Sequence, residues 1–422
     1  MSFNPFNEKP VGIDSTFVDW SKIYPVSYDK HEVDPYTKTR VILMNGTEFE
    51  AVWFSHQFHR HCNNNDIRRE LSDLRRVEQQ QQKRISCIKP VNETILETTI
   101  SYEQLAVDLT AILAQREKDL YVKSALDFAL LEDFDHLYRF ANLLDMEHSV
   151  HAERLLGSYT EFFPGRPTIS EHRHPFDDVK RPVDFKTADP ITKLNVAIIT
   201  AAEQQTMNYY MNQNGFYSSD IGRRLYQEIG MIEEEHVTLY GGLMDVNATW
   251  LECLLNHEYT ECYLYYSCYK DETNPKVKAI WEEMLVQEIA HLHKAAEMLK
   301  KYEKKEWQEV IPMGEFPELL AFSPQKSYLR NVLKKTVLNT GHFETYKDVN
   351  DMDPKARFFE YQDKVNDNPS LNPSHQVIDM HIREFGSDYR YEESPNPREE
   401  LRDRKTDNIS LGRVQSKVKE KA

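Results

Sequence analysis

The chain has 422 residues, of which 69 are acidic and 52 basic, so its formal net charge is −17. This acidic balance argues against nucleic acid or an anionic membrane as the main partner, because both carry negative charge. No run of 18 apolar residues occurs, and the first ten residues lack a basic segment followed by an apolar one. The five cysteines form no C-x-x-C pair. We therefore expect a cytoplasmic protein without a membrane span.

The N-terminal part of the chain is predicted to begin with an irregular arm over residues 1–46, because its prolines lie among polar residues. The pair Asn45-Gly46 is typical of a β-hairpin turn. The apolar residues that follow do not alternate with polar ones, so we favour a helix over Thr47–His61 that Thr47 caps. A second helix is expected over Ile67–Cys87.

Two further helices, Asn92–Ala114 and Leu120–Asp145, complete an N-terminal helical region over residues 47–145. The next stretch, residues 146–190, is rich in proline and interrupts the helical pattern. We predict that this stretch is a long crossover segment with one short helix around Val150–Glu161.

Helical patterns resume over residues 191–303. Beyond them, residues 304–422 are predicted to form an irregular extension with short helices such as Ser327–Leu338. A charged tail with few aromatic residues begins near Ser387. The prediction is an all-α chain of repeated helical hairpins with irregular arms at both ends. The four helices expected over residues 191–303 are Thr192–Asn214, Asp220–Leu243, Thr249–Lys270 and Pro275–Tyr302.

Six acidic and histidine residues between positions 201 and 291 repeat with constant spacing. A glutamate is followed by a second glutamate and, three positions after that, by a histidine, and the whole set then recurs with identical intervals. A helical hairpin returns the chain to its starting level after about 30 residues, since each leg has ~13–14 residues that rise ~1.5 Å each. The interval between the two glutamates matches this length in both copies, so each first glutamate should face the later pair at one height. The six residues are Glu203, Glu233, His236, Glu258, Glu288 and His291.

These carboxylates interrupt helix faces that are otherwise apolar. The positions four and seven residues from Glu258 hold Leu251, Leu254, Cys262 and Tyr265. Burying an ionised carboxylate without a partner costs several kcal/mol, and no lysine or arginine lies beside the carboxylates on these faces. Two divalent cations would neutralise four carboxylates, with the histidines as nitrogen ligands. The pattern therefore predicts two divalent metal ions as cofactors, iron first and manganese second.

The same spacing occurs twice more in the N-terminal region. Glu103, Asp133 and His136 have the intervals of the intact sets and precede the first of them in the chain. A fourth, degenerate copy carries an amide where the others carry histidine. The four hairpins would form two pseudo-duplicated four-helix units, of which the second holds the intact ligands. The residues of the degenerate copy are Glu48, Glu78 and Gln81.

A glutamate followed by Glu-x-x-His in each of two hairpins resembles the ferritin-like di-iron carboxylate superfamily, which includes rubrerythrins, ferritins and di-iron oxygenases. The resemblance covers roughly residues 95–302 and rests on the motifs. It implies a helical bundle in which Glu203 and Glu258 are metal ligands from two helices. It also implies that the second glutamates bridge or cap the metals and that each histidine binds one metal. These residues are Glu233, Glu288, His236 and His291.

One feature departs from the superfamily. Its members relate the two hairpins by a two-fold axis, which requires a long crossover between them. The hairpins of the intact set are joined by a short turn near Asp245–Thr249, whereas the long crossover precedes the hairpin of Glu203. An alternative site therefore combines that hairpin with Glu103, Asp133 and His136. We place the intact set first because its ligands are unsubstituted.

Other polar residues near these motifs are expected to be solvated. His172 and His174 lie in the proline-rich crossover and are predicted to be loop residues. Glu261 is also an alternative ligand to Glu258, because it lies three residues further along the same helix. The four glutamates expected to be exposed helix charges are Glu234, Glu235, Glu261 and Glu297.

Function follows from this pattern only as a class. The first hypothesis is an oxidoreductase that activates O₂ or peroxide and hydroxylates a small organic substrate. Because the chain encodes no Cys₄ iron centre, such an enzyme needs a separate electron-donor protein, and a homodimer is a candidate assembly. The alternatives are an iron-handling protein that oxidises and stores iron, and a metal-free helical scaffold.

Overall fold

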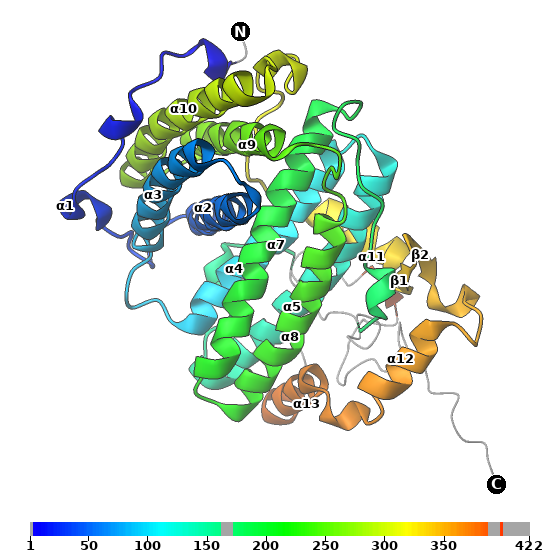
Figure 1. Cartoon of the computed structure of the whole chain (residues 1–422). Coiled ribbons are helices and arrows are strands. Elements are labelled where there is room, and N and C mark those ends of the chain that lie inside the picture. The colour runs from blue at the N-terminus through cyan, green and yellow to red at the C-terminus, as the bar shows by residue number, and fades with distance from the viewer. Residues whose placement is uncertain (1–2, 162–171, 387–396, 400–422) are drawn as a thin grey trace. The chain divides into compact units, whose positions relative to one another are not determined.

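The computed structural model describes residues 3–161, 172–386 and 397–399. Within them the chain forms thirteen α-helices, short 3-10 turns and one two-stranded antiparallel sheet (Figure 1). The prediction of an all-α chain is confirmed. Among these helices none is both long and apolar enough to cross a membrane.

The chain divides into two compact units, and each is built from three separate stretches of sequence. The first unit comprises Met1–Thr94, Val183–Gln205 and Met244–Phe322. The second comprises Ile95–Pro182, Thr206–Leu243 and Ser323–Ala422. These units differ from the consecutive segments and sequence halves that we predicted. The first and fourth hairpins belong to one unit, whereas the second hairpin and the part of the third after Gln205 belong to the other.

The first unit is built on two helical hairpins. Helix α2 (Pro35–His61) is followed by α3 (Asn65–Ser86), and α9 (Trp250–Asp271) is followed by α10 (Pro275–Glu303). The two members of each hairpin pack along each other, α2 contacts α9, and α3 contacts α10. The short helix α1 (Trp20–Ile23) lies against α3. Four helices thus enclose one core.

Helix α2 begins twelve residues earlier than predicted, so the expected arm over residues 1–46 is wrong beyond residue 34. The side chain of Asp34 accepts a hydrogen bond from the backbone N–H of Tyr36, and Pro35 occupies the first helical turn. The Asn45-Gly46 pair lies within the helix. A Cβ at Gly46 would lie 3.0 Å from the Cβ of Gln205, so the glycine allows close packing and forms no turn.

The second unit has α4 (Ile95–Arg116) and α5 (Leu120–His148) as its central hairpin, and α8 (Asp220–Gly241) packs on α5. Helix α7 (Pro190–Phe216) passes from the first unit into the second after Gln205. The remaining elements are shorter. They are α6 (Glu153–Leu156), α11 (Lys326–Thr336), β1 (Asn339–His342), β2 (Thr345–Asp348), α12 (Arg357–Val365) and α13 (Pro373–Phe385).

The C-terminal elements of the second unit are more regular than the predicted irregular extension. Helices α11 and α13 pack against α5, and α13 also contacts α8. Strands β1 and β2 pair antiparallel, with Asn339 opposite Asp348 and His342 opposite Thr345. The predicted short helix around Val150–Glu161 is reduced to the four residues of α6. The predicted tail from Ser387 lies almost entirely outside the described residues.

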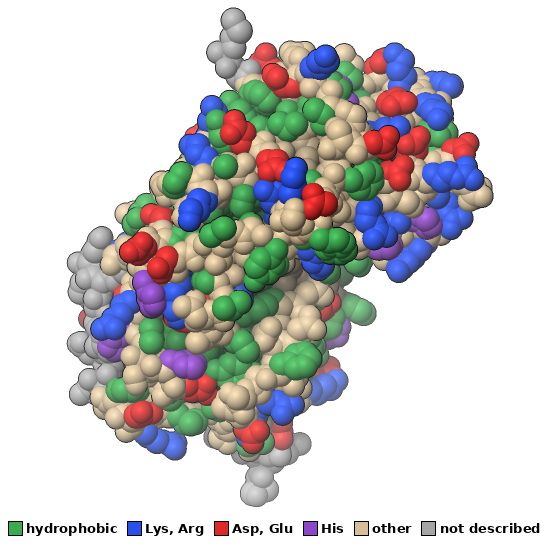
Figure 2. Space-filling view, turned by 90° about the vertical axis from the view of Figure 1, so that its left-hand side faces the viewer, with side chains coloured by type: hydrophobic (Ala, Val, Ile, Leu, Met, Phe, Trp, Pro, Cys, Tyr) green, Lys and Arg blue, Asp and Glu red, His purple; other side chains and the backbone are tan. Residues whose placement is uncertain are grey.

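The charged side chains of the surface are of mixed sign. On the face drawn in Figure 2, acidic and basic side chains are interspersed among polar and apolar ones. The net charge of −17 is therefore not gathered into one acidic field on that face. The acidic residues that matter most for the site are buried.

Candidate metal centres

The first unit holds a buried cluster of five glutamates and one histidine, contributed by all four of its long helices. Each of these side chains is at most 2% exposed. One ligand atom from each of Glu78, Glu258 and His291 lies within 4.8 Å of the others, and the same holds for Glu258, Glu261 and Glu288. The six residues of this first-unit cluster are Glu48, Glu78, Glu258, Glu261, Glu288 and His291.

The first-unit cluster has few hydrogen-bond donors of its own. The hydroxyl of Tyr265 donates to Glu48, and the side-chain amide of Gln81 donates to Glu288. The Nδ1 atom of His291 lies 3.2 Å from Glu288 Oε2 and 3.8 Å from Glu258 Oε2.

Positive charge is also scarce in the first-unit cluster. Within the described residues no lysine or arginine forms an ion pair with its five carboxylates. Both carboxylate oxygens of Glu258 and the Nε2 atom of His291 lack a hydrogen-bond partner there. For Glu261 the nearest cationic candidate is the Nε2 atom of His257, at 3.7 Å.

Burial disfavours the ionised form of the carboxylates in this cluster. It raises the pKa of Glu48, Glu258 and Glu261 well above the usual value, and neighbouring carboxylates raise it further. For Glu78, burial and Glu288 raise the pKa to about 7, against the opposing effect of His291. As it stands, the first-unit cluster favours protons or metal ions on its carboxylates.

The second unit holds a comparable cluster with a different composition. Its members come from α4, α5 and α8, and each is 0% exposed. Single ligand atoms of Glu103, His136 and Glu233 lie within 4.8 Å of one another, and those of Asp133, Glu233 and His236 do so as well. The six residues of this second-unit cluster are Glu103, Glu132, Asp133, His136, Glu233 and His236.

Glu233 lies between two histidines that face it with the same ring nitrogen. The Nδ1 atom of His136 is 2.9 Å from Glu233 Oε1, and the Nδ1 atom of His236 is 3.3 Å from Glu233 Oε2. Burial alone would raise the pKa of Glu233, but the two imidazoles, when protonated, outweigh burial and hold it below its usual range.

A second carboxylate fixes the orientation of His236. The Nε2 atom of His236 lies 2.8 Å from Glu132 Oε2, so this nitrogen donates its proton to Glu132. The other oxygen of Glu132 accepts a hydrogen bond from the guanidinium of Arg173, which also pairs with Asp178 and with Glu235 at 3.2 Å. Metal-binding histidines are commonly held in this way, with one nitrogen on an outer carboxylate and the other turned to the metal.

A tyrosine donates to the first glutamate of each cluster. Tyr265 donates to Glu48 in the first unit, and Tyr210 donates to Glu103 in the second. These tyrosines lie seven residues after Glu258 and Glu203, so the sequence repeat extends to them. Burial raises the pKa of both hydroxyls well above the usual value, which keeps them protonated as donors.

Five residues of the predicted intact set are divided between the two clusters and do not form one site. Glu258, Glu288 and His291 lie in the first-unit cluster, whereas Glu233 and His236 lie in the second-unit cluster. The grouping differs because the hairpin α9–α10 packs on α2–α3. The alternative hairpin of Glu103, Asp133 and His136 does meet Glu233 and His236 within one unit.

Glu203 lies on α7 and is 1% exposed. It precedes Tyr210 by seven residues, so the two side chains share one face of the helix. Its proposed role as a ligand stays a prediction, as do the metal-binding roles of the other predicted residues.

Two residues of the second-unit site were missed in the sequence. Glu132 directly precedes Asp133 and has no counterpart in the ligand pattern, and Arg173 lies in the proline-rich crossover, where no periodicity marks it. Glu261 was expected to be exposed but is 0% exposed. His172 was expected to be solvated, yet its Nε2 atom lies 3.0 Å from Glu228 on α8.

Three other glutamates are more exposed. The expectation that Glu234 and Glu297 are solvated is confirmed, and the side chain of Glu297 is 65% exposed. The expectation that Glu235 is exposed is wrong, because its side chain lies beside Arg173 and is only 13% exposed.

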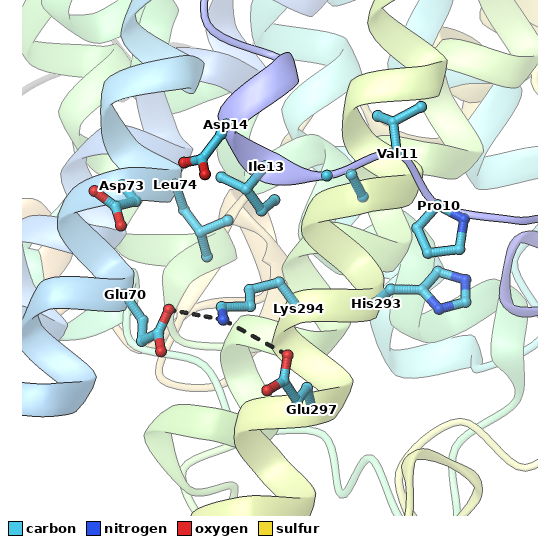
Figure 3. Close-up of a pocket in the computed structure, with 12 residues that line it drawn as sticks. Pro10, Val11, Ile13, Asp14, Glu70, Asp73, Leu74, His293, Lys294 and Glu297 are labelled. Atoms are coloured by element: carbon cyan, nitrogen blue, oxygen red, sulfur yellow. Dashed lines mark ion pairs between the residues drawn. The ribbon is translucent and has the colours of Figure 1, made fainter.

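A surface pocket of about 380 Å³ lies between the N-terminal arm, α3 and α10 (Figure 3). Lys294 crosses it and pairs with Glu70 at 2.8 Å and Glu297 at 3.5 Å. No member of the first-unit cluster lines this pocket, although Leu74 and Ala290 in its lining belong to the helices that carry the cluster. The described residues therefore keep the carboxylates of the first unit out of this pocket.

Known proteins do not place either cluster in a family. Comparisons of the chain with protein-family models, with curated proteins and with solved structures found no match. We therefore infer the function of the two clusters from the chemistry of their own side chains.

Proposed function

We propose that the second-unit cluster holds two divalent metal ions, iron or manganese, and that the chain is an oxidoreductase that activates O₂ or peroxide. A small organic molecule is the substrate to be hydroxylated. The observation that carries the proposal is the orientation of His236, whose Nε2 atom is committed to Glu132 while its Nδ1 atom faces Glu233 and Asp133.

This orientation requires a positive charge between the side chains. With its proton on Nε2, a neutral His236 presents a lone pair at Nδ1, which lies 3.3 Å from Glu233 and 3.5 Å from Asp133. Acceptor then faces acceptor unless a proton or a metal ion lies between them. His136 points the same ring nitrogen at the other oxygen of Glu233, at 2.9 Å, so imidazole nitrogens face this carboxylate from both sides. A pair of metal ions beside Glu233 accounts for both rings at once.

The donor set fits iron or manganese. Carboxylate oxygens and imidazole nitrogens are ligands for both ions. His136 and His236 would bind through Nδ1, with Glu233 between them and with Asp133 and Glu103 as further carboxylates. Glu203 on α7 would complete the set, as the repeat predicts.

When bound, such a metal pair supplies the redox chemistry for reaction with O₂ or peroxide. The chain supplies the surroundings. The complete burial of the cluster excludes water, and Tyr210 holds a proton at Glu103. The contact of Arg173 with Glu132 fixes the carboxylate that orients His236. Electrons for turnover would come from a separate donor protein.

The test is metal analysis and O₂ uptake of the purified full chain after anaerobic loading with Fe²⁺. Glu233→Ala and His236→Ala should each lose about two metal ions per chain and most of the O₂ uptake. Glu234→Ala is the matched control, because Glu234 is the next residue on the same helix and is exposed. A Glu233→Ala chain that keeps the metal content and O₂ uptake of the parent would overturn the proposal.

The same assay separates the iron-handling alternative. An oxidoreductase should continue to consume O₂ when a reductant is present, without accumulating oxidised iron. Uptake that stops after the added Fe²⁺ is oxidised, with iron retained in large excess over two ions per chain, would favour storage.

A further inference from the structure

We propose that the first-unit cluster is a second metal centre, independent of the one in the second unit, and that it prefers manganese to iron. The second-unit proposal concerns other residues on other helices, so either can fail without the other. The residues that would hold the ions are Glu48, Glu78, Glu258, Glu261, Glu288 and His291.

Glu258 is buried without a hydrogen-bond partner. Its side chain is 0% exposed, both of its oxygens lack a hydrogen-bond partner, and it belongs to both close groups of ligand atoms in the unit. A buried polar group without a partner costs about 1–3 kcal/mol, and more when it is charged. The unpartnered Nε2 atom of His291 is a second buried atom of this kind. Glu258 and His291 therefore offer three buried ligand atoms, none of which has a hydrogen-bond partner.

The charge of the cluster is also unbalanced. Five carboxylates share the core with one histidine, His291, and a second histidine, His257, reaches only Glu261, at 3.7 Å. Arg75 acts on Glu78 from three residues away on α3, but its guanidinium donates to Ser55 and Ser72. Two divalent ions would offset four of the five negative charges, which no described lysine or arginine does.

The ligand types of the first-unit cluster favour manganese. Gln81 occupies the position of the repeat that His136 occupies in the second unit, and its amide nitrogen donates to Glu288. Glu261 adds a carboxylate at the position where the second unit has Thr206. Relative to the second unit, the first unit has exchanged an imidazole for a carboxylate. Oxygen-rich donor sets suit manganese, whereas imidazole suits iron, copper, nickel and zinc.

The experiment uses the full chain with the second unit disabled by Glu233→Ala and His236→Ala. After chelation and dialysis, the chain is titrated with Mn²⁺, and bound ions are counted by mass spectrometry and by the loss of the free Mn²⁺ signal in electron paramagnetic resonance. Two Mn²⁺ ions per chain are expected. In this background Glu258→Gln should lose them, whereas Glu297→Gln should not, because Glu297 is an exposed carboxylate on α10.

A chain with the second unit disabled that binds no Mn²⁺ would overturn the proposal, and so would a Glu258→Gln chain that binds as many ions as its parent. Circular dichroism shows whether each variant is folded. The second-unit proposal is tested separately, by the metal content and O₂ uptake of a chain that carries only Glu258→Gln and has an intact second unit.

A second variant tests the preference for manganese without removing any ligand. Gln81→His restores the imidazole of the repeat and keeps all six residues. Measured under anaerobic conditions, it should increase the binding of Fe²⁺ relative to Mn²⁺ by about tenfold or more, because imidazole suits iron whereas carboxylate suits manganese. An unchanged ratio of the two affinities would refute the predicted selectivity. Asn45→His, on the neighbouring helix α2 but outside the cluster, is the control for an added histidine.

Discussion

The two units bury acidic side chains at equivalent positions of one repeat but compensate them differently. In the second unit, two histidines face Glu233, and Arg173 enters from the crossover to hold Glu132. In the first unit, His291 lies among five carboxylates, His257 reaches Glu261 at 3.7 Å, and no described arginine or lysine pairs with the five. The helical repeat therefore sets where the carboxylates lie, and residues outside the repeat decide how their charge is balanced.

One pair of equivalent positions explains much of this difference. Glu132 directly precedes Asp133 on α5, and the equivalent residue of the first unit is Val77 on α3, which directly precedes Glu78 and is 1% exposed. In the second unit Glu132 accepts the Nε2 proton of His236. In the first unit the corresponding carboxylate is absent, and the Nε2 atom of His291 is left without a partner.

The largest effect is expected from removing Arg173, which pairs with the second-unit cluster. No described arginine does the same for the first-unit cluster. Arg173→Met should destabilise the second unit by about 3–5 kcal/mol, because it leaves Glu132, Asp178 and Glu235 without their buried cation. Urea denaturation measures this. Lys364→Met is the control, since both partners of its ion pair with Glu360 are more than two-thirds exposed, and it should cost at most about 1 kcal/mol. Equal losses of unfolding free energy in the two variants would contradict the role of Arg173 as the cation that balances the buried carboxylates.

The free energy of unfolding of the metal-free chain should fall with rising pH, because of the buried carboxylates of the first unit. Glu78 has a pKa of about 7 in the fold against 4.5 usually, so the fold binds its proton more tightly than the unfolded chain does. The stabilising effect is fully present below about pH 4.5 and is lost as the pH rises through about 7. The loss amounts to roughly 3 kcal/mol.

Urea denaturation of the chelated chain between pH 4.5 and pH 8 tests this dependence. Glu78→Gln should make the fall in stability over that range smaller by roughly 3 kcal/mol, because the amide does not titrate. The remaining fall comes from Glu48, Glu258 and Glu261, whose pKa values are also raised. Saturating Mn²⁺ should restore stability at pH 8, because the ions replace the protons. A metal-free chain whose stability rises steadily from pH 5 to pH 8 would show that the carboxylates of the first unit are compensated in some other way.

A smaller effect is expected from loosening His236 without touching the proposed ligands. Glu132→Gln keeps an acceptor oxygen but removes the charge that pairs with Arg173. Metal affinity of the second unit should fall about 10–100-fold, with the Mn²⁺ affinity of the first unit unchanged. Isothermal titration with Fe²⁺ under anaerobic conditions, repeated with Mn²⁺, measures both. A fall in both affinities would argue that Glu132 supports the whole chain rather than one histidine.

The smallest effect is expected at the two tyrosines that occupy equivalent positions in the two units. Tyr265→Phe and Tyr210→Phe each remove one hydroxyl that donates to a buried glutamate, and each should cost about 1 kcal/mol of unfolding free energy. Thermal unfolding of both variants tests whether the repeat extends to these hydroxyls. Strongly unequal costs would show that one tyrosine serves its unit in a further way.

The helices and the heights of the acidic residues could be predicted because both depend on local spacing. The interval between Glu258 and Glu288 corresponds to one hairpin, and the structure places both residues in one buried group with Glu261. The early start of α2 was missed because Asn45-Gly46 favours a turn in isolation, whereas packing against Gln205 keeps it helical.

The pairing of hairpins and the balance of charge could not be predicted in the same way. All four hairpins carry the same apolar faces, so periodicity does not tell which two pack together. The long crossover before Glu203 was the only signal for the pairing of the second unit, and nothing corresponded to it for the first. Arg173 lies in that crossover, far along the chain from both Glu132 and His236, where no local pattern connects them.

The interleaving of the two units has a consequence for synthesis on the ribosome. Helix α3 ends at Ser86 and α9 begins at Trp250, so more than a third of the chain lies between the two hairpins of the first unit. At ~5–20 residues per second, the early hairpin waits roughly 10–30 s for its partner. During that interval Glu48 and Glu78 remain hydrated while the apolar residues beside them are uncovered. Chaperones that bind nascent chains would therefore meet this hairpin first, and truncated chains that end before α9 should aggregate.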